Sequence, residues 1–273
     1  MKTDKMNTEV TRPVAAITGA TSGFGKLFAQ HLAKRGNDLI LIARREEILL
    51  DLKENLTKHY GVNVTILVAD LSKENDLIRV EKKLIETSNL YWMINNAGFG
   101  GNQVFPNVDV QVESDMIRVH CLATMRLARA ALVPMTANRC GRIINLASVA
   151  GFLCGDGAAD YTATKAYVIT FSKSLQCDVH RNGIRVQALC PGFARTGFHD
   201  APTMSTSTIK QDVPWFLWLS ADYVVRCSLR SIERRCFYRV ICIPSLLYKV
   251  VTFFGSEWIF SPLRILFSRG RVR

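Results

Sequence analysis

The chain alternates short apolar runs with longer stretches of helical hydrophobic period, and this alternation limits its fold more than any other feature. The apolar runs lie at residues 14–17, 39–43, 64–69, 91–94, 142–147 and 184–189. They lack a regular polar face, which is typical of strands buried on both sides. Such strands, alternating with helices, form a parallel sheet covered by helices on both faces. The sequence therefore predicts an α/β fold built on one doubly wound parallel sheet.

The same pattern predicts a single domain. A length of 273 residues permits one large α/β domain or two small ones, and 48% hydrophobic residues are ample for a core. The strands and helices extend over residues 13–243, with a last strand at 238–243. We expect a polar extension at residues 1–12 and a basic amphipathic tail at residues 244–273.

A glycine-rich turn follows the first predicted strand. Gly19, Gly23 and Gly25 are spaced G-x-x-x-G-x-G, and a helical pattern follows them. Such a turn lets the backbone approach a pyrophosphate at the helix N-terminus, where unpaired N–H groups and the helix dipole attract anions. An ordinary tight turn is the alternative. The position at the first strand–helix junction favours a dinucleotide site.

The end of the second predicted strand indicates which dinucleotide. An acidic residue here would bind the ribose 2′-hydroxyl of NAD, but Arg44 and Arg45 follow the strand instead. A guanidinium fork suits a 2′-phosphate, so we expect the cofactor to be NADP(H). Alternatively, both arginines are solvated at the start of the next helix, and for Arg45 this interpretation is nearly as good.

Ser148, Tyr161 and Lys165 form the candidate catalytic set. Tyr161 and Lys165 are four residues apart, which places them on one face of a helix, and Ser148 follows a predicted strand. An ammonium near a phenol favours the phenolate and lowers its pKa, while a serine hydroxyl can hold a substrate oxygen. A Tyr-x-x-x-Lys motif alone is weak, because chance often produces it.

The position of these residues relative to the sheet strengthens the interpretation. Several polar features fall at the carboxyl ends of the predicted strands, where an open α/β sheet binds its ligands. They are the glycine turn, Arg44, Asp70, Asn96, Ser148 and Pro191. One ligand could contact them all.

Together these motifs resemble the short-chain dehydrogenase/reductase family over about residues 13–198. The resemblance implies a Rossmann-like fold in which Tyr161 is the general acid/base, Ser148 orients the carbonyl, and Lys165 binds the ribose and lowers the tyrosine pKa. It also implies a cofactor site that includes the glycine turn and the loops after later strands. Its expected residues are Gly19, Thr21, Ser22, Gly23, Phe24, Gly25, Arg44, Asp70, Leu71, Asn96, Ala97, Gly98, Tyr161, Lys165, Pro191, Gly192 and Thr196.

One position departs from the family pattern. Family members usually carry an asparagine that helps to hold a proton-relay water beside the lysine, and His120 stands at the matching position. A histidine can offer its backbone carbonyl and can titrate near neutrality, so His120 joins the catalytic candidates. The relay persists in altered form, or it is impaired, or His120 packs in the core.

Two functions are consistent with these sequence features. The first is an NADP(H)-dependent carbonyl reductase that interconverts a ketone or aldehyde and an alcohol, on an apolar or lipid-like substrate. The apolar run at 214–218 suits such a substrate, with Cys154 and Gly155 nearby and a lid at 199–208, although 214–218 can equally be core. The alternative is a catalytically impaired NADP(H)-binding sensor or scaffold, supported only by His120.

Charge and composition bear on partners and location. A net charge of +12 allows anionic partners, but the chain has no recognised nucleic-acid-binding motif, so we expect none. The tail suits peripheral contact with a membrane, or equally a cap over the cleft or a subunit contact. The resemblance implies a homo-oligomer through helices near 112–137 and 161–180.

The 8 cysteines lack a Cys-x-x-Cys pair and fall mostly in apolar runs, so we interpret them as core residues in a reducing compartment. The polar N-terminus has no apolar signal-peptide segment, and the 5 histidines lack metal-ligand spacing. The expectation is a cytoplasmic protein, membrane-associated if the tail binds lipid, with no metal.

Overall fold

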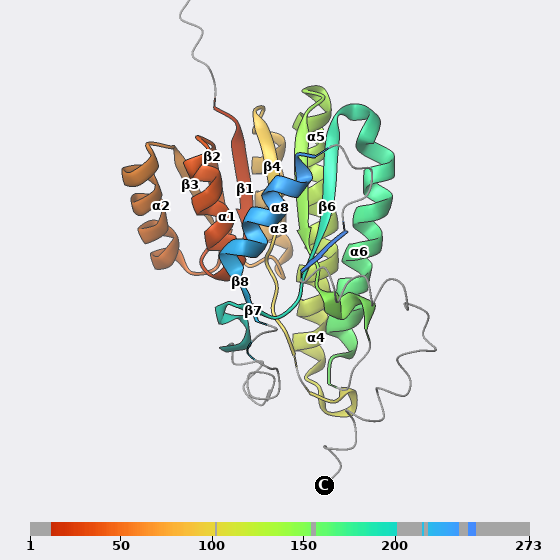
Figure 1. The fold of residues 1–273 in the computed structure, drawn as a ribbon. Helices are drawn as coiled ribbons and strands as arrows, with labels where there is room; N and C mark the ends of the chain where they lie inside the picture. The colour runs from red at the N-terminus through yellow and green to blue at the C-terminus, as the bar shows by residue number, and fades with distance from the viewer. Residues whose placement is uncertain are drawn as a thin grey trace, which may run out of the picture.

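The computed structural model describes residues 12–101, 103–153, 157–200, 215, 218–234 and 240–243. Within them a 7-stranded sheet has the order β3-β2-β1-β4-β5-β6-β9, and every neighbouring pair is parallel (Figure 1). Its strands are β1 Val14–Thr18, β2 Asp38–Ala43, β3 Val64–Val68, β4 Leu90–Asn95, β5 Gly141–Leu146, β6 Ile184–Pro191 and β9 Val240–Ile243. The predicted doubly wound parallel sheet is confirmed.

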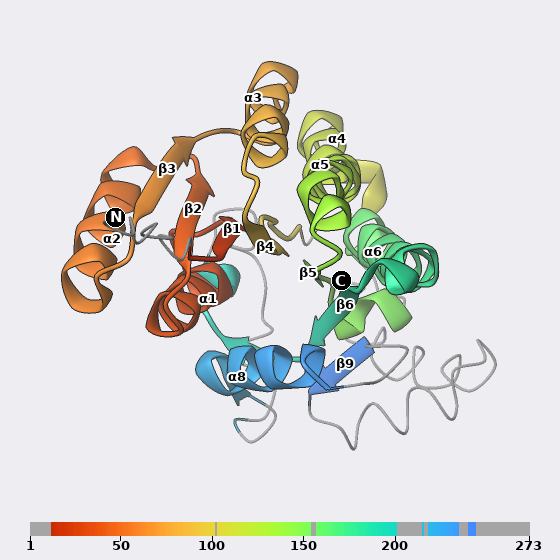
Figure 2. The same cartoon turned by 90° about the horizontal axis from the view of Figure 1, so that it is seen from above.

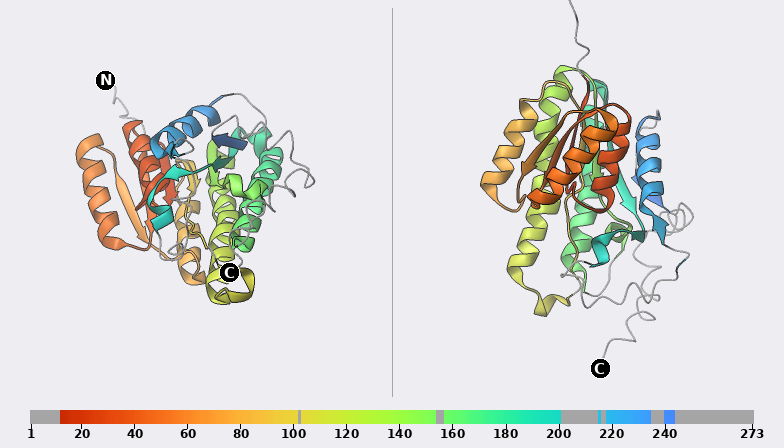
Figure 3. Two further views of the ribbon diagram at one scale, coloured as in Figure 1. Left: turned by 60° about the horizontal axis from the view of Figure 1, so that its bottom comes forward. Right: turned by 90° about the vertical axis from the view of Figure 1, so that its left-hand side faces the viewer.

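Helices cover both faces of this sheet. They are α1 Gly23–Lys34, α2 Glu46–Tyr60, α3 Glu74–Ile85, α4 Val110–Ile117, α5 Thr124–Ala137, α6 Ala159–Val179 and α8 Ala221–Ile232. Figure 2 shows α1, α2 and α8 on one face and α3, α4, α5 and α6 on the other. The two further views in Figure 3 show the same layering, with α8 beside α1.

The two layers form because successive strand residues point to opposite faces. In β1, Ala15 and Ile17 pack with the residues of α1, α2 and α8, whereas Val14 and Ala16 pack with those of α3 and α5. All of β1 is buried, which explains why the strand has no polar face in the sequence. Each face of the sheet therefore has its own apolar core.

The strand order reverses between β1 and β4, and this reversal positions the site. From β1 the chain proceeds outward to β3 and then returns to the other side of β1 through β4. The loops after β1 and β4 consequently diverge, and ligands of open α/β sheets bind where they part. Gly19 follows β1 and Asn96 follows β4, so both lie at this point.

Several local expectations need correction. The helix predicted at 112–137 contains a π-helical segment, Arg118–Ala123, between α4 and α5. A small parallel ribbon, β7 Ala194–Arg195 with β8 Leu219–Ser220, was not predicted. Of the five cysteines whose burial the structure describes, Cys190 is buried, Cys177 is exposed, and Cys121, Cys140 and Cys227 are partly buried. The interpretation as core residues therefore holds for Cys190 and is wrong for Cys177.

Other predictions fall on residues outside the described ranges. They are residues 1–11 of the extension, Cys154 and Gly155, the segment 201–214, and the tail 244–273. Of the apolar run at 214–218, Trp215 is 78% exposed, which argues against a core position for that side chain. In the described part of the chain, no helix has the length and apolar character needed to cross a bilayer.

Candidate active site

The glycine turn after β1 has a backbone that other residues would not adopt easily. Gly19 and Gly23 have positive φ angles of 63° and 51°. A Cβ atom on Gly25 would lie 2.2 Å from the carbonyl oxygen of Gly19, too close for any side chain. Ser22, the N-cap of α1, makes no side-chain capping bond, so the first N–H groups of α1 face the turn without a cap. This arrangement, called the cradle below, has the backbone geometry and the unpaired N–H groups that suit an anion.

The loop after β4 holds this turn in place. The Thr18 hydroxyl accepts hydrogen bonds from the backbone N–H groups of Asn96 and Ala97, each at 2.9 Å. The Asn96 amide donates to the carbonyl oxygens of Thr18 at 2.9 Å and Gly19 at 3.2 Å. Thr18 was not among the expected site residues. Its position as the last residue of β1 is the signal that could have identified it.

The structure places Arg45 nearer the turn than the sequence suggested. Both Arg44 and Arg45 are exposed after β2, and Arg45 Nη2 donates to the Thr21 hydroxyl at 2.8 Å. Arg45 therefore contacts the glycine turn from the end of β2. This contact favours a role in phosphate binding over the alternative of a simply solvated side chain. A pair of cations at this end of the sheet suits a phosphate.

The other expected cofactor residues lie at the same edge of the sheet. Asp70 and Leu71 follow β3, and the Asp70 carboxylate accepts from the backbone N–H and hydroxyl of Ser72 at 3.0 and 2.9 Å. Ser72 is therefore hydrogen-bonded to Asp70, and the N-cap of α3 is Lys73. Thr196, after β6, has its Cβ 3.4 Å from the place a Cβ on Gly23 would occupy. The remaining members, Ser22, Phe24, Gly98, Pro191 and Gly192, lie in the same loops or at the adjoining ends of α1 and β6.

Ser148, Tyr161 and Lys165 meet beyond the end of β5. Ser148 caps the short 3₁₀ helix Val149–Phe152, and its hydroxyl accepts from the backbone N–H of Ala150 at 3.1 Å. It also lies close enough to the Tyr161 side chain to lower the pKa of that phenol. Lys165 is buried, its ammonium donates to the carbonyl oxygen of Leu146 at 3.0 Å, and it lies 5.5 Å from the centre of the Tyr161 ring. The three side chains therefore converge, as their spacing predicts.

Burial sets the acidity of this set. Desolvation raises the pKa of Tyr161 to about 12, against a smaller lowering by the Ser148 side chain, so the lowering expected from Lys165 is not found. Desolvation also lowers the pKa of Lys165 to about 8. At neutral pH Tyr161 is therefore a protonated phenol with a proton to give, and Lys165 is still mostly an ammonium. The arrangement can donate a proton to an oxygen held beside Ser148.

The family is established by comparison. The model of the short chain dehydrogenase family matches residues 13–204. This chain belongs to that family. The family consists of oxidoreductases, and the glycine turn, Asn96 and the Ser148–Tyr161–Lys165 set all lie inside the matched region.

Relatives and solved structures agree with this assignment. The very-long-chain 3-oxoacyl-CoA reductase of Anas platyrhynchos is 32% identical over 187 residues, which are 67% of this chain and 60% of that protein. The 3-oxoacyl-(acyl-carrier-protein) reductase FabG of Rickettsia prowazekii is 34% identical over 192 residues, 70% of this chain and 77% of that protein. A short-chain dehydrogenase from Sphingobium yanoikuyae in complex with NADPH aligns with a TM-score of 0.78, at 31% identity, over 90% of this chain and 95% of that chain.

In this short-chain dehydrogenase, His120 occupies a buried position in the π-helical segment. Its Nε2 accepts from the backbone N–H of Phe99 at 3.1 Å, and its Nδ1 lies 2.9 Å from the Thr164 hydroxyl. Burial, together with the charge of Lys165, places the pKa of His120 well below its usual value. The ring is therefore neutral, and the expectation that His120 titrates near neutrality is corrected.

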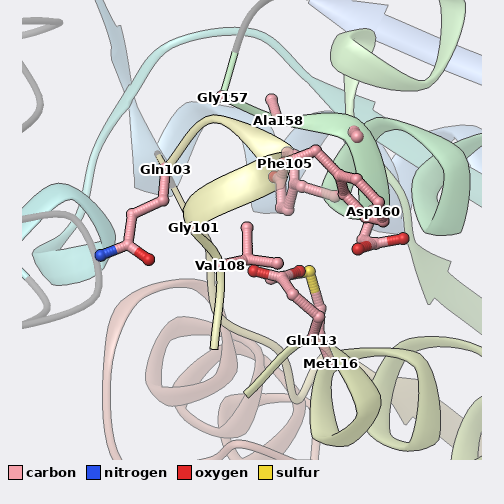
Figure 4. A pocket seen from close by; sticks show the side chains of 11 residues that line it. Gly101, Gln103, Phe105, Val108, Glu113, Met116, Gly157, Ala158 and Asp160 are labelled. Atoms are coloured by element: carbon pink, nitrogen blue, oxygen red, sulfur yellow. The ribbon is translucent and has the colours of Figure 1, made fainter. Parts of the chain in front are cut away.

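A small pocket lies beside Tyr161, between α4, α6 and the loop after β4 (Figure 4). Its apolar wall consists of Phe105, Val108 and Met116. The carboxyl groups of Glu113 and Asp160 face each other across it. Burial and the charge of Asp160 raise the pKa of Glu113. Glu113 and Asp160 were absent from the expected site, because only the fold brings α4 against the start of α6.

A metal site requires several ligand side chains close together in space. No group of three or more His, Cys, Asp or Glu side chains within the described ranges is arranged to hold a metal ion.

Proposed function

We propose that this protein is an NADP(H)-dependent reductase that interconverts a ketone or aldehyde and an alcohol. The observation that carries the proposal is the convergence of Ser148, Tyr161 and the buried Lys165 at the sheet edge that also holds the glycine turn. The NADPH complex of the Sphingobium yanoikuyae relative, and the reductase names of the other two, support the cofactor and the reaction class.

The cradle suits a dinucleotide. Gly19 and Gly25 let the turn pack directly against Asn96 and against its own backbone. The uncapped N-terminus of α1 faces this turn, and a pyrophosphate could bind there. We assign the 2′-phosphate to Arg44 and Arg45, the adenine side to Asp70 and Leu71, and the nicotinamide side to Gly98 and the 191–196 loop. When bound, NADP(H) supplies or accepts the hydride.

Side chains of the protein carry out the proton transfer. Ser148 holds the substrate oxygen through its hydroxyl, next to the Tyr161 phenol. Tyr161 gives its proton to that oxygen during reduction and takes it back during oxidation. We assign the ribose contact to the Lys165 ammonium, which lies 5.5 Å from the centre of the Tyr161 ring. Among the described residues, the contacts of His120 do not displace Ser148, Tyr161 or Lys165. We therefore favour an active enzyme over a catalytically impaired sensor.

The substrate that we propose has an apolar body. Phe105, Val108 and Met116 form one wall of the pocket beside Tyr161, and apolar walls with a few polar groups are typical of small-molecule sites. Glu113 and Asp160 add an acidic side to the pocket, which disfavours a substrate with a carboxylate near its carbonyl group.

We also propose that two copies associate through α6. Tyr167 is 40% exposed on this helix and stacks on Phe171, with ring centres 5.8 Å apart and planes inclined by 5°. A shallow hollow beside them is lined by Ala163, Ala166, Thr170 and Ser174, whose small side chains suit close packing. Short-chain dehydrogenases commonly form oligomers.

The test is a screen of ketones and aldehydes that follows NADPH consumption. With any accepted carbonyl compound, we expect Tyr161→Phe to lower turnover on the order of 10²- to 10⁴-fold, because the proton donor is lost. Tyr60→Phe, on the exposed end of α2, is the control and should keep its activity. Full turnover by Tyr161→Phe would refute the mechanism, and equal use of NADH would refute the cofactor assignment.

A further inference from the structure

Thr164 is a buried residue that the proposed mechanism does not use. It lies on α6 between Tyr161 and Lys165 and is 4% exposed. Its hydroxyl lies 2.9 Å from the carbonyl oxygen of Tyr161 and 2.9 Å from Nδ1 of His120. One hydroxyl thus joins the backbone of the proton donor to a ring that belongs to another helix.

The chemistry of the three groups fixes where the protons are. A carbonyl oxygen only accepts, so the single proton of the Thr164 hydroxyl points to Tyr161. The hydroxyl oxygen must then accept from His120, which places a proton on Nδ1. On the other side of the ring, the Phe99 N–H can only donate, so Nε2 must carry a lone pair. Both ends of the ring require the same neutral tautomer.

The surroundings leave no place for a second proton on this ring. A proton on Nε2 would face the N–H of Phe99, and the Lys165 ammonium already carries a positive charge nearby. A Cβ atom on Gly98 would lie only 2.7 Å from Nε2, so the ring fills the space beside that loop. His120 therefore acts as a fixed spacer between the loop after β4 and α6.

We propose that Thr164 is a positioning residue, whose hydroxyl ties the backbone of Tyr161 through His120 to the Gly98–Phe99 loop. The inference rests on the proposed function, because the distance that it fixes is the one between the cofactor cradle and the proton donor. Asn96, in the same loop, holds the glycine turn through its bonds to Thr18 and Gly19. The bridge thus connects the two halves of the site by direct contacts.

A small error in this distance should slow the chemical step strongly and change the binding of cofactor and substrate little. A misplacement of about 1 Å between reacting groups can slow an enzyme by about 10²-fold, whereas the cofactor cradle itself does not involve Thr164. Loss of the hydroxyl should therefore lower kcat and leave the KM of the carbonyl substrate and the affinity for NADPH nearly unchanged. A general loss of folding would lower all three.

The experiment compares Thr164→Val, Thr164→Ser and Thr162→Val. Thr162 is the matched control, because its hydroxyl bonds to the carbonyl oxygens of Ala158 and Ala159 on the same helix and has no contact with His120 among its described bonds. We expect Thr164→Val to lower kcat about tenfold or more. Thr164→Ser should restore kcat to within about threefold of the wild type, and Thr162→Val should leave it unchanged within about twofold. An equal loss in Thr162→Val, or no loss in Thr164→Val, would overturn the proposal.

A second readout does not depend on activity. With ¹⁵N-labelled histidine in the full chain, the wild-type His120 ring should show a neutral Nδ1–H tautomer at neutral pH. Thr164→Val should shift its Nδ1 resonance, and Thr162→Val should not. A charged or Nε2–H ring at neutral pH would contradict the bridge whether or not a substrate is found. An intact bridge without turnover on any carbonyl would contradict the proposed function instead.

Discussion

The two halves of the ligand edge are held together in different ways. At the cofactor half, the turn after β1 is shaped by glycine backbone and by the hydrogen bonds that Asn96 donates to Thr18. At the catalytic half, the geometry depends on the side chains of the buried Lys165 and the partly buried Tyr161. Backbone packing determines the geometry of the cofactor half, whereas the burial of a charged side chain dominates the catalytic half.

This difference separates stability from function. Hydrogen bonds between buried neutral groups contribute to folding, and in the cofactor half these bonds also build the cradle. Burying an ammonium costs free energy, and in the catalytic half the pKa of Lys165 falls to about 8 as a result. A substitution in the first half should therefore damage fold and binding together, whereas one in the second half can remove function and spare the fold.

The largest effect should come from Gly25→Ala. Its Cβ would lie 2.2 Å from the carbonyl oxygen of Gly19, and backbone atoms cannot yield as a side chain can. We expect NADPH binding to fall below detection and the melting temperature to drop by several degrees, since overpacking typically costs about 1–3 kcal/mol or more. Isothermal calorimetry and thermal melts measure both. Gly197→Ala is the control, because nothing lies within 4 Å of its Cβ position. Equal NADPH affinity in the two variants would show that the cradle is not limited by space.

A smaller effect, of the opposite kind, is expected from Lys165→Met. Burial lowers the pKa of Lys165 from 10.5 to about 8, so the folded protein holds this proton less firmly than the unfolded chain does. Below about pH 8 the full cost of burying the charge is present, and it disappears as the pH rises toward 10.5. Stability of Lys165→Met relative to the wild type should therefore be greater at pH 7 than at pH 11, by roughly 3 kcal/mol.

Thermal and denaturant unfolding at the two pH values measure this difference, with the exposed Lys173→Met on the same helix as control. Turnover by Lys165→Met should be lost at both pH values. If its relative stability does not change with pH, the buried ammonium is not a cost to the fold.

The contrast also explains what the sequence could predict. The glycine turn and the strand ends are recognisable because space and backbone geometry leave few residue choices, and Ser148, Tyr161 and Lys165 follow from their spacing on a strand end and a helix. The expectation for His120 was wrong about titration, because the partners of its two nitrogens, Phe99 and Thr164, are brought to the ring only by the fold.

The smallest effect concerns Glu113→Gln, at the pocket that the sequence did not reveal. Burial and the neighbouring Asp160 raise the pKa of Glu113 above its usual 4.5, so the folded protein holds this proton more firmly than the unfolded chain does. The cost of ionising Glu113 in the folded protein therefore appears as the pH rises above about 4.5. Glu113→Gln should melt higher than the wild type at pH 7, by no more than about 2 °C, because Glu113 is partly solvated. At pH 4 this advantage should vanish. Glu54→Gln, exposed on α2, should show no such dependence, and a Glu113→Gln protein that is less stable at pH 7 would mean that the carboxyl pair stabilises the pocket.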